Sequence, residues 1–254
     1  RNHRPGVKPA VMAAGLAATF SASQILKYAD AWTSASNKLA AAGVASGDLA
    51  DRQAELVDVA NESRTGAQET IALYSRLTIA TQEMGSSASE TMRLTELMNK
   101  AFQSSGSSTQ EAASAALQLS QALASGLLQG DELRSLRENA PLLAKAIADA
   151  MGVSIGELKK LGSEGKITSS VVMSAILAAG DSIDARFQAT QVTVSQALTI
   201  LNNEIGKFIG QTDASLSATE RLAQGIQIFA RNLETAKDVV LAAATVIGTT
   251  LAAR

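Results

Sequence analysis

The fold class is set by residues 117–176, which read LQLSQALASGLLQGDELRSLRENAPLLAKAIADAMGVSIGELKKLGSEGKITSSVVMSAI. Apolar residues recur in this stretch at spacings of three and four, as they do along the buried face of an amphipathic helix. Pro141 stands where a helix can begin, because the first helical position needs no amide hydrogen. The breaks are mostly glycines, namely Gly130, Gly152, Gly162, Gly165 and, just beyond the stretch, Gly180. We therefore expect a compact set of short helices in the middle third of the chain.

Helix start signals continue on both sides of this stretch. A serine three residues before a glutamate has the spacing of a capping box, in which each side chain bonds the other residue's backbone amide. This spacing occurs at Ser108, Ser154 and Ser217. Simple N-cap candidates are Asp48, Ser87 and Thr168.

Together these signals predict an all-α fold. The expected helices cover approximately residues 9–42, 48–62, 66–84, 88–102, 109–127, 131–138, 141–151, 155–161, 169–179, 181–208 and 217–254. Leu117, Leu119 and Leu123 are expected on one buried helix face. No segment shows the sustained period-two alternation of a strand. We predict a multi-helix bundle of helical hairpins, with no sheet, that continues into a coiled-coil-like C-terminal helix.

Composition agrees with helices and excludes several kinds of site. The 254 residues are 46% hydrophobic but only 3% aromatic, which favours helices over sheets. The absence of cysteine excludes disulfides, thiolate nucleophiles and iron–sulfur sites, and a single histidine, His3, excludes catalytic triads and multi-histidine metal sites. The net charge is −2, so no basic excess drives direct nucleic-acid binding, which we do not expect.

Sequence motifs for catalysis are weak. Gly165 and Lys166 match the last two residues of the phosphate-loop motif G-x-x-x-x-G-K. The first glycine of that motif would be residue 160, which is a lysine here, so the match fails. Ser163 and Lys166 fit the S-x-x-K pattern, in which lysine activates serine, but the partner elements of that pattern are missing. We therefore predict no enzyme and no catalytic, cofactor or metal residues, with Ser163 and Lys166 as the enzymatic alternative.

The two ends of the chain have patterns of their own. Residues 1–22 begin with basic residues and continue into an apolar run, which fits either a secretory signal or an alanine-rich helix start. The uncharged run 239–253 is shorter than the roughly 20 residues that span a bilayer, so membrane contact would need sequence beyond residue 254. The start at Arg1 and the stop at Arg254 in mid-pattern are expected of a segment of a longer protein.

The C-terminal pattern predicts an oligomer seam. Apolar residues follow strict four-three heptad spacing at Leu222, Ile226, Phe229, Leu233, Ala236, Val240, Ala243 and Ile247. The same spacing occurs at Val194, Leu198, Leu201, Ile205 and Phe208. Small or apolar flanking positions favour a homo-oligomer of three or more copies over a dimer. Packing within one chain is the alternative.

Residues 117–176 closely resemble the tape measure domain found near the N-terminus of tail tape measure proteins of long-tailed phages and prophages. The flanks agree with this resemblance. YADAWTSASNKL (28–39) is similar to the family's opening helix, ALYSRLTIATQEMG (72–85) to its second block, and VSQALTILNNEIGKFIG (194–210) to its closing helix. The resemblance covers roughly residues 23–233.

The resemblance implies a structural virion protein in the lumen of the phage tail. Such a protein templates tail length during assembly in the host cytoplasm and is released at genome ejection. The implied partners are the tail tube protein, tail-tip or terminator proteins and tail assembly chaperones. The alternative is a helical protein-interaction module or a secreted effector-like bundle without a virion role.

The resemblance also suggests how the chain is divided. We expect a leader or apolar helix start over 1–22, a helical tape measure domain over 23–211, and a heptad-patterned helix over 212–254 that leads into a missing downstream region. In the family the longer downstream region usually spans the tube. The Gly- and Ser-interrupted chain is therefore expected to be a folded end module rather than the ruler itself.

Overall fold

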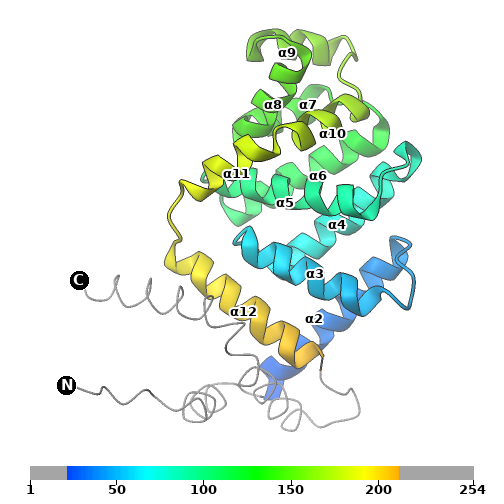
Figure 1. The fold of residues 1–254 in the computed structure, drawn as a ribbon, viewed down its shortest axis with the longest axis vertical. Coiled ribbons are helices and arrows are strands. Elements are labelled where there is room, and N and C mark those ends of the chain that lie inside the picture. Colours follow the sequence, from blue (N-terminus) through cyan, green and yellow to red (C-terminus); the bar gives the residue numbers. More distant parts are fainter. Residues whose placement is uncertain (1–21, 212–254) are drawn as a thin grey trace, which may run out of the picture. The chain divides into compact units, whose positions relative to one another are not determined.

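The computed structural model describes residues 22–211, and these fold into helices without a strand (Figure 1). The helices are α2 (Ala22–Ala41), α3 (Leu49–Glu62), α4 (Ala67–Thr81), the 3-10 helix η1 (Gln82–Met84), α5 (Ala88–Ser104), α6 (Thr109–Ser125), α7 (Gly130–Asn139), α8 (Pro141–Met151), α9 (Ile155–Ser163), α10 (Ser169–Ala178), α11 (Gly180–Gln188) and α12 (Val194–Gly210). The predicted all-α fold class is confirmed.

The chain divides into two compact units. Of the described residues, 22–36 and 193–211 form one, called here the terminal unit, and 37–192 form the other, called here the central unit. The boundary at Ser36 falls within α2. The seam from Leu222 to Ile247 and the leader over 1–22, apart from Ala22, lie outside the described residues.

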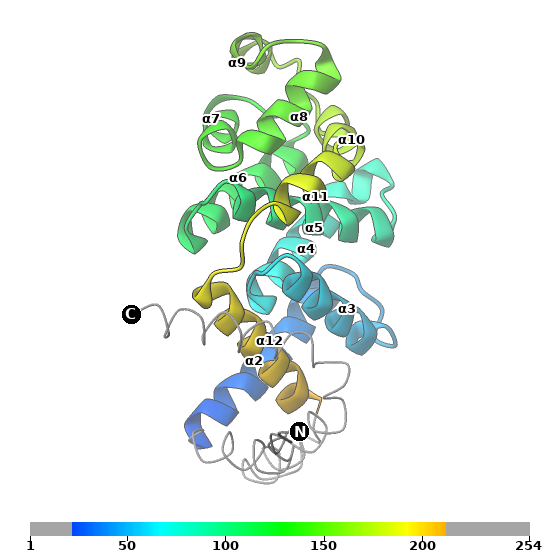
Figure 2. The ribbon, with the colours of Figure 1, turned by 60° about the vertical axis from the view of Figure 1, so that its left-hand side comes forward.

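The central unit is built on one large apolar core. In it α6 packs against α4 and α7, α5 packs against α4 and α11, and α10 packs against α8 (Figure 2). The side chains at the centre are almost fully buried, among them Leu77, Leu94, Leu97, Leu119 and Leu143. Burial of such leucines stabilises the fold by about 1.5–3 kcal/mol each, which is why the helices assemble.

The middle third forms the short helices that its glycines predicted. α7, α8 and α9 lie in sequence between two segments, 126–128 and 167–169, that are hydrogen-bonded to each other. Leu128 N donates to Ile167 O at 2.8 Å, and Ser169 N donates to Gly126 O at 2.9 Å. Gly162 packs closely against α7, because a Cβ atom there would lie 2.7 Å from Leu133 Cδ2 and would force that side chain to shift. Pro141 occupies the first turn of α8, as predicted.

The helix start signals are mostly confirmed. Ser108 and Ser154 form complete capping boxes, and Thr168 accepts a hydrogen bond from Val171 N. Ser87 does more than predicted, because Glu90 completes a capping box with it. Ser217 lies outside the described residues.

Asp48 stands at the N-cap position of α3, as predicted, but its side chain does not cap the helix. Its backbone is helical, with φ −102° and ψ −5°, and its side chain makes no capping hydrogen bond. An N-cap side chain normally reaches the free amides from an extended backbone, which Asp48 does not have.

The single helix predicted over 181–208 is wrong. α11 ends at Gln188, and α12 begins at Val194 after an extended Thr193. Thr193 and Gln196 form a capping box that starts a new helix there. The apolar periodicity continues across 181–208 and therefore predicted one helix despite this start signal.

Burial follows the predicted apolar faces with exceptions. Leu119 and Leu123 are buried, but Leu117, expected on the same face, is 38% exposed. On α12, Phe208 is buried, Leu201 and Ile205 are half-buried, and Leu198 is 46% exposed. Leu117 is two residues before Leu119, a spacing that turns its side chain away from that face.

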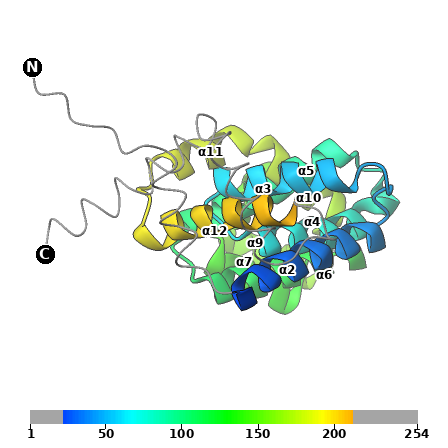
Figure 3. The same cartoon turned by 90° about the horizontal axis from the view of Figure 1, so that it is seen from below.

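In the terminal unit, α2 and α12 lie side by side (Figure 3). Ile25 and Ala29 of α2 form a buried apolar cluster with Ile209 of α12. Tyr28 of α2 and Ile205 of α12 pack against this cluster.

Candidate functional site

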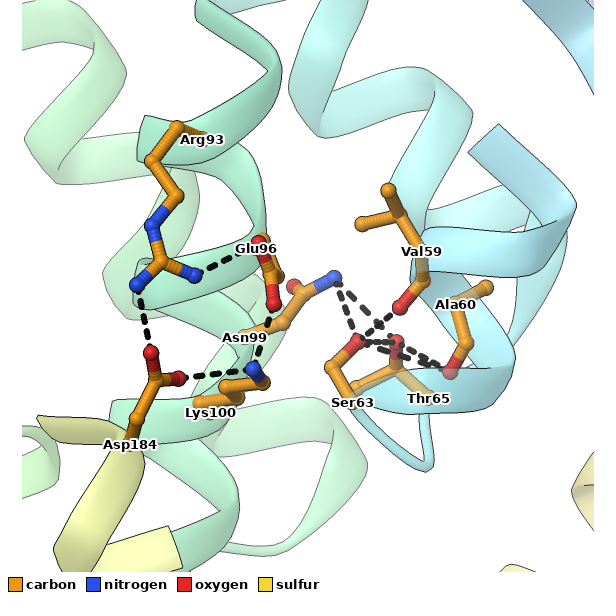
Figure 4. A network of polar contacts seen from close by, with 9 residues as sticks. All are labelled: Val59, Ala60, Ser63, Thr65, Arg93, Glu96, Asn99, Lys100 and Asp184. Atoms are coloured by element: carbon orange, nitrogen blue, oxygen red, sulfur yellow. Dashed lines mark hydrogen bonds and ion pairs between the residues drawn. The ribbon is translucent and has the colours of Figure 1, made fainter. Parts of the chain in front are cut away.

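A network of polar contacts fixes α11 to the rest of the central unit. It comprises Arg64, Arg93, Glu96, Lys100 and Asp184, with Phe187 and Thr190, and is called here the α11 clamp. Its charged part is centred on Asp184 (Figure 4). Arg93 Nη2 lies 2.5 Å from Asp184 Oδ2, and Lys100 Nζ lies 2.7 Å from Asp184 Oδ1. Glu96 accepts from Arg93 at 2.7 Å and also from Lys100.

Local sequence places the α5 members of the clamp on one face. Arg93, Glu96 and Lys100 are three and four residues apart, the spacing at which side chains of a helix are neighbours. Gly180 begins α11, and a Cβ atom there would lie only 3.2 Å from Arg93 Nη2. The glycine therefore allows the start of α11 to lie close to the guanidinium.

The clamp is partly withdrawn from water, which strengthens its charge pairs. The side chains of Lys100 and Glu96 are 12% and 14% exposed, and those of Asp184 and Arg93 are 22% and 35% exposed. Burial by itself would raise the pKa of Asp184, but hydrogen bonds from Arg93 and Lys100 outweigh it and lower that pKa.

The two cations respond in the opposite direction. Burial would lower the pKa of Lys100, but its hydrogen bonds to Asp184 and Glu96 raise it above the ordinary value. The pKa of Arg93 is raised in the same way against the effect of burial. In the charged part of the clamp, Arg93 and Lys100 are therefore each paired with both Asp184 and Glu96.

The second part of the clamp holds the C-terminal end of α11. Arg64 Nη1 donates to Thr190 Oγ1 at 2.9 Å and to Thr190 O at 3.3 Å. The Arg64 guanidinium carbon lies 4.3 Å from the centre of the Phe187 ring, within cation–π range. Burial lowers the pKa of Arg64. A cation here also compensates the negative end of the helix dipole.

Arg64 reaches this position from a strained turn. Its φ is +57°, a left-handed conformation that costs a non-glycine residue about 1 kcal/mol or more. A buried polar network holds this turn: Asn99 Nδ2 lies 3.1 Å from Thr65 Oγ1, 3.0 Å from Thr70 Oγ1 and 3.4 Å from Ser63 Oγ. The hydroxyls of Ser63 and Thr65 thus tie the α3–α4 turn to Asn99 of α5, next to the clamp (Figure 4). The hydroxyl of Thr70 ties the first turn of α4 to the same side chain.

The α11 clamp holds α11 against α5 and the α3–α4 turn, so its chemistry is that of a structural contact. Each of its charges already has a partner of opposite sign or a backbone carbonyl. The clamp residues were not predicted as a site from the sequence. The spacing of Arg93, Glu96 and Lys100 was visible, but the pairing with Asp184 spans 84–91 residues and leaves no local signal.

The residues of the enzymatic alternative have other partners. Ser163 Oγ donates to Lys160 O at 2.7 Å, and Lys166 Nζ pairs with Glu164 at 2.7 Å. A general base must share a hydrogen bond with its nucleophile, and here both groups are engaged elsewhere. Over the described residues, no group of three or more acidic, histidine or cysteine side chains is placed to hold a metal ion. In the same part of the chain, every helix is too short or too polar to cross a membrane.

Comparison with known families matches residues 23–214 to a family model described as tape measure protein. This match covers well over half of the 254 residues. No match was found among curated proteins or among solved structures. The all-α fold agrees with the family match, which supports a structural role in a phage tail over an effector-like bundle. The chain belongs to the tape measure protein family and is a structural component of a phage tail.

Proposed function

We propose that this chain is an end module of a tape measure protein that lies in the tail-tube lumen, templates tail length during assembly and leaves the tail at genome ejection. The observation that carries the proposal is the family match over residues 23–214. The fold adds a reason to regard the described part as an anchor, because its helices are short and form a packed core instead of one long rod.

The α11 clamp supports the anchoring role. Residues 189–193 connect α11 to α12, and the heptad pattern of 222–247 follows α12 in sequence. One path by which tension on the downstream chain would reach the central unit therefore runs through the end of α11. Arg64 holds Thr190 at this end, and Asp184 is held by two cations. Several partly buried charge pairs resist displacement better than isolated exposed ones.

Length control would then depend on the downstream helical region. An α-helix rises about 1.5 Å per residue, so a helical rod has a length proportional to its number of residues. Tube subunits that polymerise around such a rod stop when its end is reached. The anchored module fixes one end of the rod at a tail terminus.

The proposal includes partners. The seam from Leu222 to Ile247 gathers three or more copies through its heptad positions. The module docks on tail-tip or terminator proteins, the rod contacts the tail tube protein, and assembly chaperones shield apolar helices in the host cytoplasm before the tube closes.

The test is to follow the chain through the life of a virion. Purified particles of a phage that encodes it are analysed by quantitative mass spectrometry before and after genome ejection is triggered. We expect the chain in intact particles at a fixed ratio to the tube protein, and its loss from particles that have ejected. A chain that is retained after ejection, or found in culture supernatant without virions, contradicts the proposal.

A further inference from the structure

We propose that α2 and α12 form a releasable clasp, in which Tyr28 and Trp32 are seated on Gly206 and Gly210, and that this clasp opens before the central unit unfolds. The clasp is separate from the α11 clamp and does not depend on length control.

The clasp pairs two large rings with two glycines. Tyr28 and Trp32 are four residues apart on α2, and Gly206 and Gly210 are four residues apart on α12, so each pair lies on one helix face. A Cβ atom on Gly206 would lie 3.3 Å from Tyr28 Cδ1, and one on Gly210 would lie 2.2 Å from Trp32 Cγ. The ring of Trp32 therefore occupies the space of a missing side chain.

A hydrogen bond fixes how the two helices align. Tyr28 Oη donates to Asn202 Oδ1 at 2.8 Å, and Asn202 is one helical turn before Gly206. Asn202, Gly206 and Gly210 thus form a row along α12 that contacts two residues of α2. Beside this row, Ile25 and Ala29 pack against Ile209.

Three features make the clasp releasable. Its hydrogen bond is solvent-exposed, so water competes for both partners and the bond contributes little net stability. Its rings are half-buried, whereas the leucines at the centre of the central unit are almost fully buried. The residues of the clasp belong to the terminal unit, and regions with less buried apolar surface open first in folded proteins.

Release would uncouple two parts of the chain. Residues 1–21 precede α2, and residues 212–254 follow α12. A closed clasp holds α2 and α12 together, and an open clasp lets the two helices separate while the central unit stays folded. The clasp is thus a conformational device that joins the first and last helices of the described chain.

The tryptophan makes the test direct, because Trp32 is the only one among the 254 residues. In the full chain, Trp32 emission excited at long wavelength reports on the clasp, and far-UV circular dichroism reports mainly on the helices of the central unit. In a urea titration we expect the Trp32 transition to have a lower midpoint than the loss of helix. Coincident midpoints would overturn the proposal.

Three glycine-to-alanine variants test the seating of the rings: two at the clasp and one control elsewhere. Alanine normally stabilises a helix relative to glycine. Gly156→Ala in α9 meets only Ser154 Oγ at 3.8 Å and is expected to leave Trp32 emission unchanged. Gly206→Ala is expected to lower the Trp32 midpoint slightly, and Gly210→Ala to shift the emission of the folded protein to longer wavelength while most helix remains. A Gly210→Ala protein with the emission and midpoint of Gly156→Ala would refute the seating of Trp32.

Discussion

At the scale of single residues, Asp184 determines how α11 is held. Its carboxylate accepts from Arg93 and Lys100, which belong to α5, so one side chain joins two helices far apart in sequence. Arg64 adds a second contact at the end of the same helix. The strained backbone of Arg64 is consistent with this role, since such conformations persist where the surrounding structure fixes them.

Removing the charge of Asp184 tests the clamp. Asp184→Asn keeps the size of the side chain but leaves two partly buried cations with weaker partners. We expect the free energy of unfolding to fall by about 1–3 kcal/mol, measured by urea denaturation. The control is Asp149→Asn, because Asp149 pairs with Lys145 on the exposed surface, where such a pair contributes about 0.5 kcal/mol or less. Equal losses in the two variants would show that the clamp is no stronger than a surface pair.

The clamp also predicts a pH dependence. The pKa of Asp184 is lower in the folded protein than its ordinary value of 3.8, so its contribution is present above that value and is lost as the pH falls through the folded pKa. The stability difference between the wild type and Asp184→Asn should therefore be constant from about pH 5 to 7 and shrink below about pH 4. The capping glutamates titrate in both proteins and cancel in the difference. A stability difference that stays unchanged at acidic pH would show that the ionised carboxylate of Asp184 does not stabilise the fold.

At the scale of elements, helix starts could be predicted from the sequence where the signal is local. Ser108 and Ser154 need only the glutamate three residues later, and both form the predicted box. Asp48 has the right side chain on the wrong backbone. The start at Thr193 carries the same kind of signal with Gln196, but a continuous apolar pattern favoured one long helix instead. Local chemistry is decisive at helix ends, whereas apolar periodicity can run across a break.

The capping boxes can be tested in one helix. Ser108→Ala removes the oxygen that accepts from Glu111 N at the start of α6. We expect a loss of about 1 kcal/mol in the free energy of unfolding. Ser114→Ala, at an exposed position inside α6, serves as the matched control and should be neutral or slightly stabilising. A Ser108→Ala protein as stable as this control would mean that the box contributes nothing.

At the scale of the whole molecule, the sequence predicted the fold class and the family but not the clamp or the clasp. The apolar spacing of Leu94, Leu97 and similar residues is set by helix geometry, so it can be read without the structure. The contacts of Asp184 with Arg93 and of Trp32 with Gly210 depend on how distant helices pack. No single-sequence pattern encodes that packing.

We propose that the seam predicted from Leu222 to Ile247 sets how many chains assemble. Ile226→Asp combined with Leu233→Asp places two charges at heptad positions, where burial of an unpaired charge is unfavourable. We expect the double variant to sediment as a monomer and the wild type to sediment as three or more copies. An unchanged sedimentation coefficient would assign these residues to packing within one chain.

The most direct measurement of the central claim is tail length by electron microscopy. In a phage that encodes the chain, four extra heptads inserted between Gln211 and Leu222 add about 28 residues to the proposed rod. We expect tails about 42 Å longer, from the rise of about 1.5 Å per residue. The same insert in the α5–α6 loop at Ser107, away from the path to the downstream chain, should leave the length unchanged. Tails of wild-type length with the first insert, in virions that contain the altered protein, would contradict the account.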